Sequence, residues 1–179
     1  MHPLSIALAL ALSAPASWTT VASWPGLIPE GADPRVVAST AALNPGARTF
    51  RMSVQMRTMK RPDKPDWDLI RKGTAKGSST QYKVEYMPEG QALCDYDGTD
   101  GSASVQGGPA LDDGRWHTVA CIKTANTLSL QIDGRVVGTD RNSIGKISND
   151  EPVVIGAHGP SGGERFEGDL QNARMDVAQ

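Results

Sequence analysis

The sequence DGRWHTVAC at residues 113–121 is followed closely by LSLQIDGRVV at residues 128–137. In both stretches every second side chain falls on the same face, the period of two that β-strands show. Asp133 and Gly134 form a dipeptide that tolerates positive φ at both central positions of a turn, which predicts a tight type I′ hairpin returning into residues 135–139. The two stretches therefore predict a meander of strands.

The same alternation recurs along the chain, between turns rich in Gly, Pro and Asp. It is clearest in residues 48–57, where apolar and polar side chains alternate without a fault. Further strands are predicted at residues 67–72, 81–87, 91–96, 102–106, 152–156 and 166–177. About a dozen short strands with almost no helical periodicity predict an all-β fold, a two-sheet antiparallel β-sandwich of the jelly-roll kind.

Length and charge limit the classes of function. With 179 residues the chain fits one domain, which can bury roughly 70% of its unfolded surface without a metal or a partner. The 18 basic and 20 acidic residues give a net charge of −2. Because like charges form no long run, the sequence offers no polyanion-binding surface, and nucleic acid is excluded as the expected partner.

The N-terminus has the pattern of an export signal. A short apolar run at residues 4–12 precedes Ala14-Pro15-Ala16, which predicts a signal peptide over residues 1–16. Only His2 stands where a basic segment is usual, so a buried first strand or helix is the alternative. Because no later segment is long enough to span a membrane, we expect a secreted protein without a membrane partner. Residues 17–35 read as an irregular lead-in with an edge strand near residues 19–24, and residues 36–179 as the sandwich domain.

Cys94 and Cys121 are the two cysteines of the chain. An even count in an exported protein favours a disulfide, and each cysteine lies in a predicted strand. The alternative is a pair of buried free thiols. A redox role is not indicated, since the chain has no CxxC spacing.

The motifs together resemble the laminin G-like domains of the concanavalin A-like lectin/glucanase superfamily, in particular small secreted actinobacterial proteins. The resemblance covers roughly residues 36–177 and implies the sandwich fold with Trp116 in its core. It departs from the pattern at Gln171, where an acidic residue is common. The matching elements are DGRWH at 113–117, LSLQIDGRVV at 128–137, ALNPG at 42–46, FRMSV at 50–54, LIRKG at 69–73, ISN at 147–149, PVVIG at 152–156 and FEGDL at 166–170.

Catalytic patterns are missing from the sequence. A glucanase of this superfamily should carry two glutamates flanking an aspartate on one strand face, and the segment from Glu164 to Asp169, which contains Glu167, has the wrong order. His117 is expected to be a strand residue satisfied by its neighbours, and His158 to lie in a loop without a partner at ligand spacing. Zinc spacings are absent as well. We therefore do not expect an enzyme.

Calcium is the candidate metal, because the resemblance implies an ion at the rim of the sandwich held by an aspartate and loop carbonyl oxygens. Hard cations bind clustered oxygen ligands, and aspartates gather in residues 95–100. Asp97 and Asp100 are the first candidates, and Asp66 and Asp68 flank Trp67. The alternative for residues 97–101 is a plain hairpin turn.

Sugar recognition needs an exposed aromatic ring beside hydrogen-bonding side chains. Burial in the core is the alternative reading for each candidate ring, and the candidates are Trp67, Tyr82, Tyr86 and Tyr96. The sequence thus predicts a secreted, non-catalytic binding module for a glycan or an extracellular surface ligand. A protein-interaction or structural domain without sugar affinity is the main alternative, and an unusual glycoside hydrolase ranks last.

Overall fold

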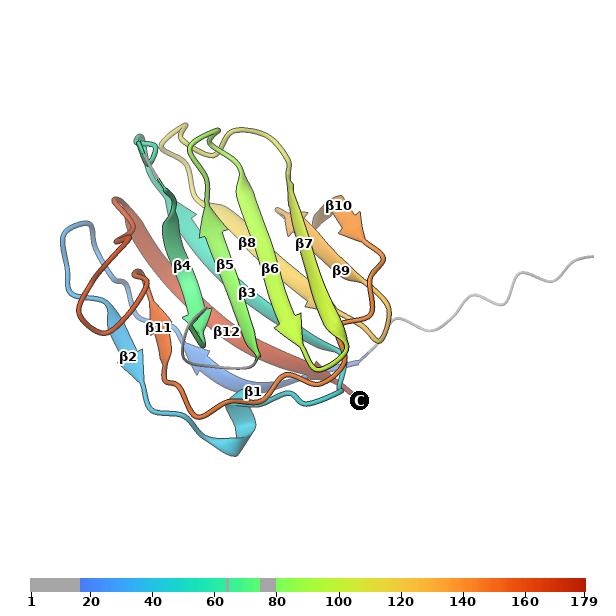
Figure 1. Cartoon of the computed structure of the whole chain (residues 1–179). Coiled ribbons are helices and arrows are strands. Elements are labelled where there is room, and N and C mark those ends of the chain that lie inside the picture. The colour runs from blue at the N-terminus through green and yellow to red at the C-terminus, as the bar shows by residue number, and fades with distance from the viewer. Residues whose placement is uncertain (1–16, 64, 75–79) are drawn as a thin grey trace, which may run out of the picture.

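The computed structural model describes residues 17–63, 65–74 and 80–179. In these residues two six-stranded antiparallel sheets pack face to face, with the front sheet toward the viewer in Figure 1 and the back sheet behind it. The front sheet has the order β2 (Arg35–Val37), β11 (Val153–Ile155), β4 (Trp67–Lys72), β5 (Gln81–Tyr86), β6 (Ala92–Gly98) and β7 (Gly101–Gly107). The back sheet has the order β1 (Trp18–Trp24), β12 (Asp169–Ala178), β3 (Phe50–Arg57), β8 (His117–Lys123), β9 (Leu128–Ile132) and β10 (Arg135–Asp140).

This architecture is the predicted two-sheet sandwich, and the predicted meander is confirmed as β8, β9 and β10. β9 and β10 are joined by Asp133 and Gly134, which have φ angles of 50° and 79° as the predicted type I′ turn requires. One short 3-10 helix, η1 (Ala41–Leu43), precedes β3. No helix in the described residues has the length and apolar character needed to cross a membrane.

The beginning of the described chain is part of the sandwich. The edge strand expected near residues 19–24 is β1, which pairs antiparallel with β12 at the edge of the back sheet. An irregular stretch then leads to β2. The predicted signal peptide, residues 1–16, lies outside the described residues.

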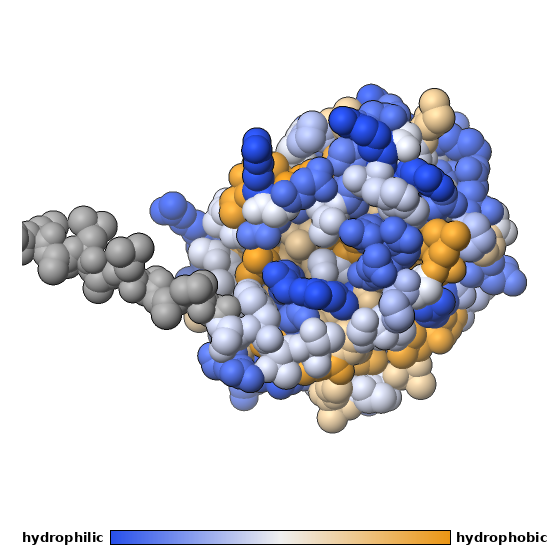
Figure 2. Space-filling model, turned by 180° about the vertical axis from the view of Figure 1, so that it is seen from behind, coloured by the Kyte–Doolittle hydropathy of each residue, from blue (hydrophilic) through white to orange (hydrophobic). Residues whose placement is uncertain are grey.

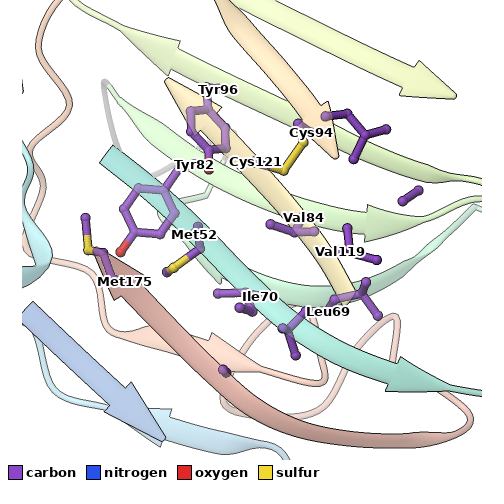
Figure 3. Close-up of a cluster of buried hydrophobic side chains, with 14 of the residues drawn as sticks. Met52, Leu69, Ile70, Tyr82, Val84, Cys94, Tyr96, Val119, Cys121 and Met175 are labelled. Atoms are coloured by element: carbon purple, nitrogen blue, oxygen red, sulfur yellow. A yellow bond between two sulfur atoms is a disulfide. The ribbon is translucent and has the colours of Figure 1, made fainter. Parts of the chain in front are cut away.

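The core lies between the inner faces of the two sheets. Phe50 and Met52 of β3 meet Tyr82 of β5 and Tyr96 of β6, and the Phe50 and Tyr96 rings stack with their centroids 5.4 Å apart. The predicted disulfide is confirmed: Cys94 of the front sheet is bonded to Cys121 of the back sheet, with a Cα–Cα distance of 5.8 Å (Figure 3). Both cysteines are fully buried, so the bond ties the two sheets together inside the core.

Trp116 corrects one expectation, because it does not lie in the core. In β8 the inward positions belong to His117, Val119 and Cys121, which are buried, so strand alternation places Trp116 on the other side. Its half-buried ring packs under Arg57, whose guanidinium carbon lies 4.8 Å from the ring centroid. Trp116 is thus part of a cation–π contact on the outer face.

Candidate functional site

A polar groove of about 440 Å³ runs over the outer face of the back sheet. Figure 2 shows this face, on which hydrophilic side chains predominate. Its floor includes one cross-strand row in which Ser23 of β1 is paired with Arg174 of β12, Arg174 with Ser53 of β3, Ser53 with Ala120 of β8, and Ala120 with Gln131 of β9. Neighbouring strands lie about 4.8 Å apart, so the row spans roughly 19 Å.

The sheet surface is hollowed along this row because the central side chains are short and those on either side are long. Ser53 and Ala120 at its centre are small, whereas Arg174 and Gln131 on either side are long. Strand alternation turns these side chains outward while their neighbours Met52, Val54, Val119 and Cys121 fill the core. The groove therefore follows from the outward half of the strand pattern.

A β-bulge shapes one wall of the groove. The register of β12 against β3 shifts between Gln171 and Arg174, and Asn172 within this bulge has a φ of 51°. The amide groups of Asn172 and Gln171 donate to Oε1 of Gln55 over 2.7 Å and 3.0 Å. Three amide side chains thus form a connected hydrogen-bonding surface, and two of them, Gln55 and Asn172, line the groove.

Arg174 of the row and Arg51 beside it share one buried carboxylate. Asp176 accepts hydrogen bonds on Oδ2 from Nε and Nη2 of Arg51 over 2.9 Å and 2.7 Å, and Nε of Arg174 lies 3.0 Å from the same oxygen. Thr20 donates to its Oδ1 over 2.7 Å. Burial alone would raise the pKa of Asp176, but the bonds from Thr20 and Arg51 outweigh it and lower the pKa below its ordinary value. The carboxylate therefore stays charged and holds both arginines in place.

The aromatic residues expected to bind sugar do not form an exposed platform. Tyr82, Tyr86 and Tyr96 are fully buried, so their rings offer no face to a ligand from outside. Trp67 is half-buried and packs on Tyr86 and Phe166, with ring centroids 6.1 Å and 5.8 Å away. Burial, the alternative reading, is what the structure has for the three tyrosines.

Asp97 and Asp100, the first calcium candidates, lie in the hairpin formed by β6 and β7. Asp97 lies in β6 and accepts from Nε2 of Gln81, and Asp100 lies in the β6–β7 turn and accepts from Oγ1 of Thr99. Among the described residues, no group of three acidic, histidine or cysteine side chains close enough to hold an ion includes either aspartate. The segment forms a β6–β7 hairpin, and a calcium site at these two aspartates, completed by backbone carbonyl oxygens, stays a prediction.

Acidic side chains do gather on the outer face of the front sheet. Carboxylate oxygens of Asp66, Asp68 and Glu85 lie within 4.8 Å of one another. Asp68 is fully buried, and its Oδ1, like Oδ1 of Asp66, has no hydrogen-bond partner in the described residues. Burial is the main cause that raises the pKa of Asp68, to about 8, with Arg71 opposing and Glu85 adding to the rise. Unpaired buried oxygens of this kind suit a hard cation such as calcium.

A second group, Asp68, His158 and Glu164, adjoins the first. Nδ1 of His158 lies 2.6 Å from Oε2 of Glu164 and 3.4 Å from Oδ2 of Asp68. Nη1 of Arg71 lies 2.9 Å from the same nitrogen, so a guanidinium already stands among these ligands. His158 thus has partners that sequence spacing did not reveal, because Asp68 and Arg71 come from β4, far away in the chain.

The glutamates that were weighed as catalytic residues point to separate partners. Glu164 contacts His158, whereas Oε2 of Glu167 is exposed and pairs with Nζ of Lys60 over 3.1 Å. His117 is satisfied by its neighbours as expected, with Nδ1 2.9 Å from Asp133 and Nε2 3.0 Å from Asp113. Each of these three side chains thus has its partners within the described part of the chain.

Sequence reasoning did not find the groove. The signal that could have indicated it is the polar half of the alternation in residues 48–57, which places Arg51, Ser53 and Gln55 on one outward face. The partners on the other strands could not be assigned without the register of the sheet.

Comparison with known proteins identifies the family. A laminin G model described as the concanavalin A-like lectin/glucanases superfamily matches residues 30–176. The chain belongs to this superfamily. No curated protein matches the sequence.

Solved structures share the superfamily fold at low identity. A carbohydrate-binding module (CBM40) of the Ruminococcus gnavus IT-sialidase, solved with α2,3-sialyllactose, is similar with a TM-score of 0.65 and 16% identity over 88% of this chain and 92% of that one. Domains LG4-5 of the mouse laminin α1 chain give a TM-score of 0.62 and 20% identity over 89% of this chain. The superfamily domain described here spans 43% of that laminin fragment. The receptor-binding domain of botulinum neurotoxin D is similar with a TM-score of 0.59 and 10% identity, over 86% of this chain and 39% of that one.

Proposed function

We propose that the protein is a non-catalytic carbohydrate-binding module and that the groove on the back sheet holds the saccharide. The observation that carries the proposal is the cross-strand row from Ser23 to Gln131, in which hydroxyl, guanidinium and amide groups face an open groove. Sugars are recognised through many hydroxyl groups, and side chains of these types can both donate to them and accept from them. The sialyllactose complex of the Ruminococcus gnavus module supports this function for the fold.

Several polar side chains of the groove are held in place by neighbouring residues before a ligand binds. Gln55 is held by Asn172 and Gln171, and Arg51 and Arg174 are held by Asp176, so these side chains lose little freedom on binding. Strand β8, which pairs with the β3 strand that carries Arg51 and Gln55, is tied to the front sheet by the disulfide at Cys121. Rigid polar groups on a sheet are suited to a ligand that is bound and released unchanged.

Titration of the full chain against a panel of oligosaccharides and polysaccharides tests the proposal. For a ligand that binds, Gln131→Ala should weaken the affinity about two- to tenfold, as loss of one neutral hydrogen bond would. The matched control is Gln106→Ala on β7 of the front sheet, where the side chain is exposed and outside the groove. No binding by any saccharide, or equal loss in both variants, would contradict the proposal.

We propose that the acidic group of Asp66, Asp68 and Glu85 binds a calcium ion that stabilises the front sheet. Two unpaired carboxylate oxygens and the raised pKa of Asp68 support this assignment. Lys83 competes for part of the site, since its Nζ lies 2.8 Å from Oε1 of Glu85. A calcium titration followed by thermal unfolding tests the site independently of any saccharide, because the groove lies on the other sheet.

We also propose that the domain is exported after cleavage of residues 1–16. The disulfide supports this, because such bonds persist in oxidising compartments. N-terminal sequencing of the protein recovered from the medium of the producing cells should begin at Ser17. Recovery of the protein inside the cells with reduced cysteines would contradict export.

A further inference from the structure

The charged side chains that line the groove are all basic. Two arginines, Arg51 and Arg174, line it, and no carboxylate is among its lining residues in the described part of the chain. The other lining side chains carry hydroxyl, amide or no polar groups. Asp176 lies beneath the arginines with 1% of its side chain exposed, so it neutralises one of the two positive charges and leaves the other facing the groove.

Arg174 has unused donors. Its Nε faces Asp176, its side chain is 44% exposed, and no contact of its Nη1 or Nη2 atoms is found among the described residues. Arg51 is more enclosed, because its guanidinium carbon lies 4.9 Å from the centroid of the Trp18 ring. The Nη1 and Nη2 groups of Arg174 can therefore donate a bidentate pair of hydrogen bonds to an oxyanion.

A neutral ligand fits this end of the groove poorly. It would cover the Arg174 guanidinium and remove its water without supplying a negative charge in return. An anionic group replaces the lost water with charge-assisted hydrogen bonds. The electrostatics thus discriminate between saccharides of otherwise equal shape.

We propose that the ligand of the groove is an acidic saccharide, one that bears a carboxylate or a sulfate, with the anionic group at Arg174 and the sugar hydroxyls along Ser53, Gln55 and Gln131. This inference rests on the proposed function, because it names the chemical class of ligand for the same groove. Asp176 is a positioning residue in this arrangement, since it touches both arginines and not the ligand.

Matched pairs of ligands test the inference with the full chain by calorimetry. The pairs are 3′-sialyllactose and 3′-sulfolactose, each against lactose, and polygalacturonate against its methyl ester. At least one acidic member should bind about tenfold more tightly than its neutral partner. The first two pairs distinguish a carboxylate from a sulfate. The preference should shrink as salt is raised.

Arg174→Gln is the decisive variant, with Arg141→Gln as the matched control, because Arg141 is exposed and outside the groove. Arg174→Gln should lower the affinity for the acidic member about tenfold and leave that for the neutral member within about twofold. Arg141→Gln should change neither. Far-ultraviolet circular dichroism of both variants shows whether the sheet is intact.

The outcomes separate this inference from the proposed function. Equal or tighter binding of the neutral members, weakened by Gln131→Ala and not by Gln106→Ala, would overturn the acidic preference and keep the carbohydrate groove. An acidic preference that Arg141→Gln reduces as much as Arg174→Gln would mean attraction by the overall surface charge and would also overturn the inference. No binding of either member of any pair would overturn both.

Discussion

His117 at the start of β8 lies with Nδ1 2.9 Å from Oδ2 of Asp133, the first residue of the β9–β10 turn. The other ring nitrogen is 3.0 Å from Asp113, so the imidazole lies between the Asp-Gly dipeptides at residues 113–114 and 133–134. Asp133 also accepts from the backbone N–H of Thr118 over 2.8 Å. The spacing of Asp113, His117 and Asp133 is thus explained by one cross-strand clamp that fixes the β9–β10 turn to β8.

The clamp predicts a pH dependence of stability. Burial lowers the pKa of His117, but its bonds to Asp133 and Asp113 outweigh burial and raise the pKa above the ordinary 6.5. The contribution of His117 to the free energy of unfolding should therefore be fully present below pH 6.5 and should be lost as the pH rises through the raised pKa. Urea unfolding of the protein and of His117→Gln from pH 5.5 to 9 measures the difference.

At low pH His117→Gln should be less stable by about 1.5–3 kcal/mol, as expected for loss of charge-assisted hydrogen bonds. This difference in the free energy of unfolding should become smaller as the pH rises. A difference that stays constant across the range would show that the imidazole contributes only as a neutral group.

The disulfide predicts a large loss of stability on removal. Cys94 and Cys121 join the two sheets across 27 positions of sequence, and both are buried. Replacing both by Ser should lower the free energy of unfolding by about 2–5 kcal/mol. Denaturant unfolding with and without reductant measures the effect, and reductant should not further change the double variant. An unaltered midpoint in the double variant would contradict a stabilising role.

Close packing around Gly98 predicts that a single methyl group is harmful. A Cβ at Gly98 would collide with the backbone carbonyl oxygen of Ile144, which cannot rotate away. Gly98→Ala should therefore destabilise the protein by about 1–3 kcal/mol or more through overpacking. Gly159→Ala is the matched control, because nothing lies near its Cβ position. Thermal unfolding compares them, and equal midpoints would contradict the predicted collision.

The fold was predictable because its signals are local. Alternation over five to ten residues and the Asp133-Gly134 turn indicate strands and hairpins before any long-range contact is known. Even the error at Trp116 was avoidable from the sequence. Trp116 and Cys121 are an odd number of positions apart, so in one continuous strand they face opposite sides, and a cysteine bonded across the core places Trp116 outside.

The two sites were not predictable in the same way. The groove row takes one residue from each of five strands, and in the order β1-β12-β3-β8-β9 the first and last strands of the described residues pair at one edge of the sheet. A one-residue change of register would turn Ser53 or Ala120 to the other face. His158 likewise meets Asp68 only because its loop folds over β4. Such contacts depend on the whole topology, which local periodicity does not contain.

The acidic group of the front sheet predicts that raising the pH lowers the stability of the calcium-free protein and that calcium raises it. The pKa of Asp68 is raised from 3.8 to about 8, so the folded protein holds a proton that the unfolded chain releases. Without calcium, the contribution of Asp68 to the free energy of unfolding should be present below pH 3.8 and lost as the pH rises toward about 8. Calcium needs the ionised carboxylates, so its stabilising effect should grow over the same range. At a concentration of 100 times Kd it should add about 2.7 kcal/mol.

Differential scanning calorimetry at pH 5 and pH 8, with calcium and with chelator, measures both effects. Asp68→Asn should remove most of the pH dependence assigned to this group and abolish the response to calcium. Asp97→Asn is the matched control, because Asp97 is an aspartate of the same sheet outside the acidic group, and its response to calcium should be retained. If Asp97→Asn abolishes the response and Asp68→Asn does not, the ion binds at the β6–β7 hairpin and the assignment to Asp68 fails.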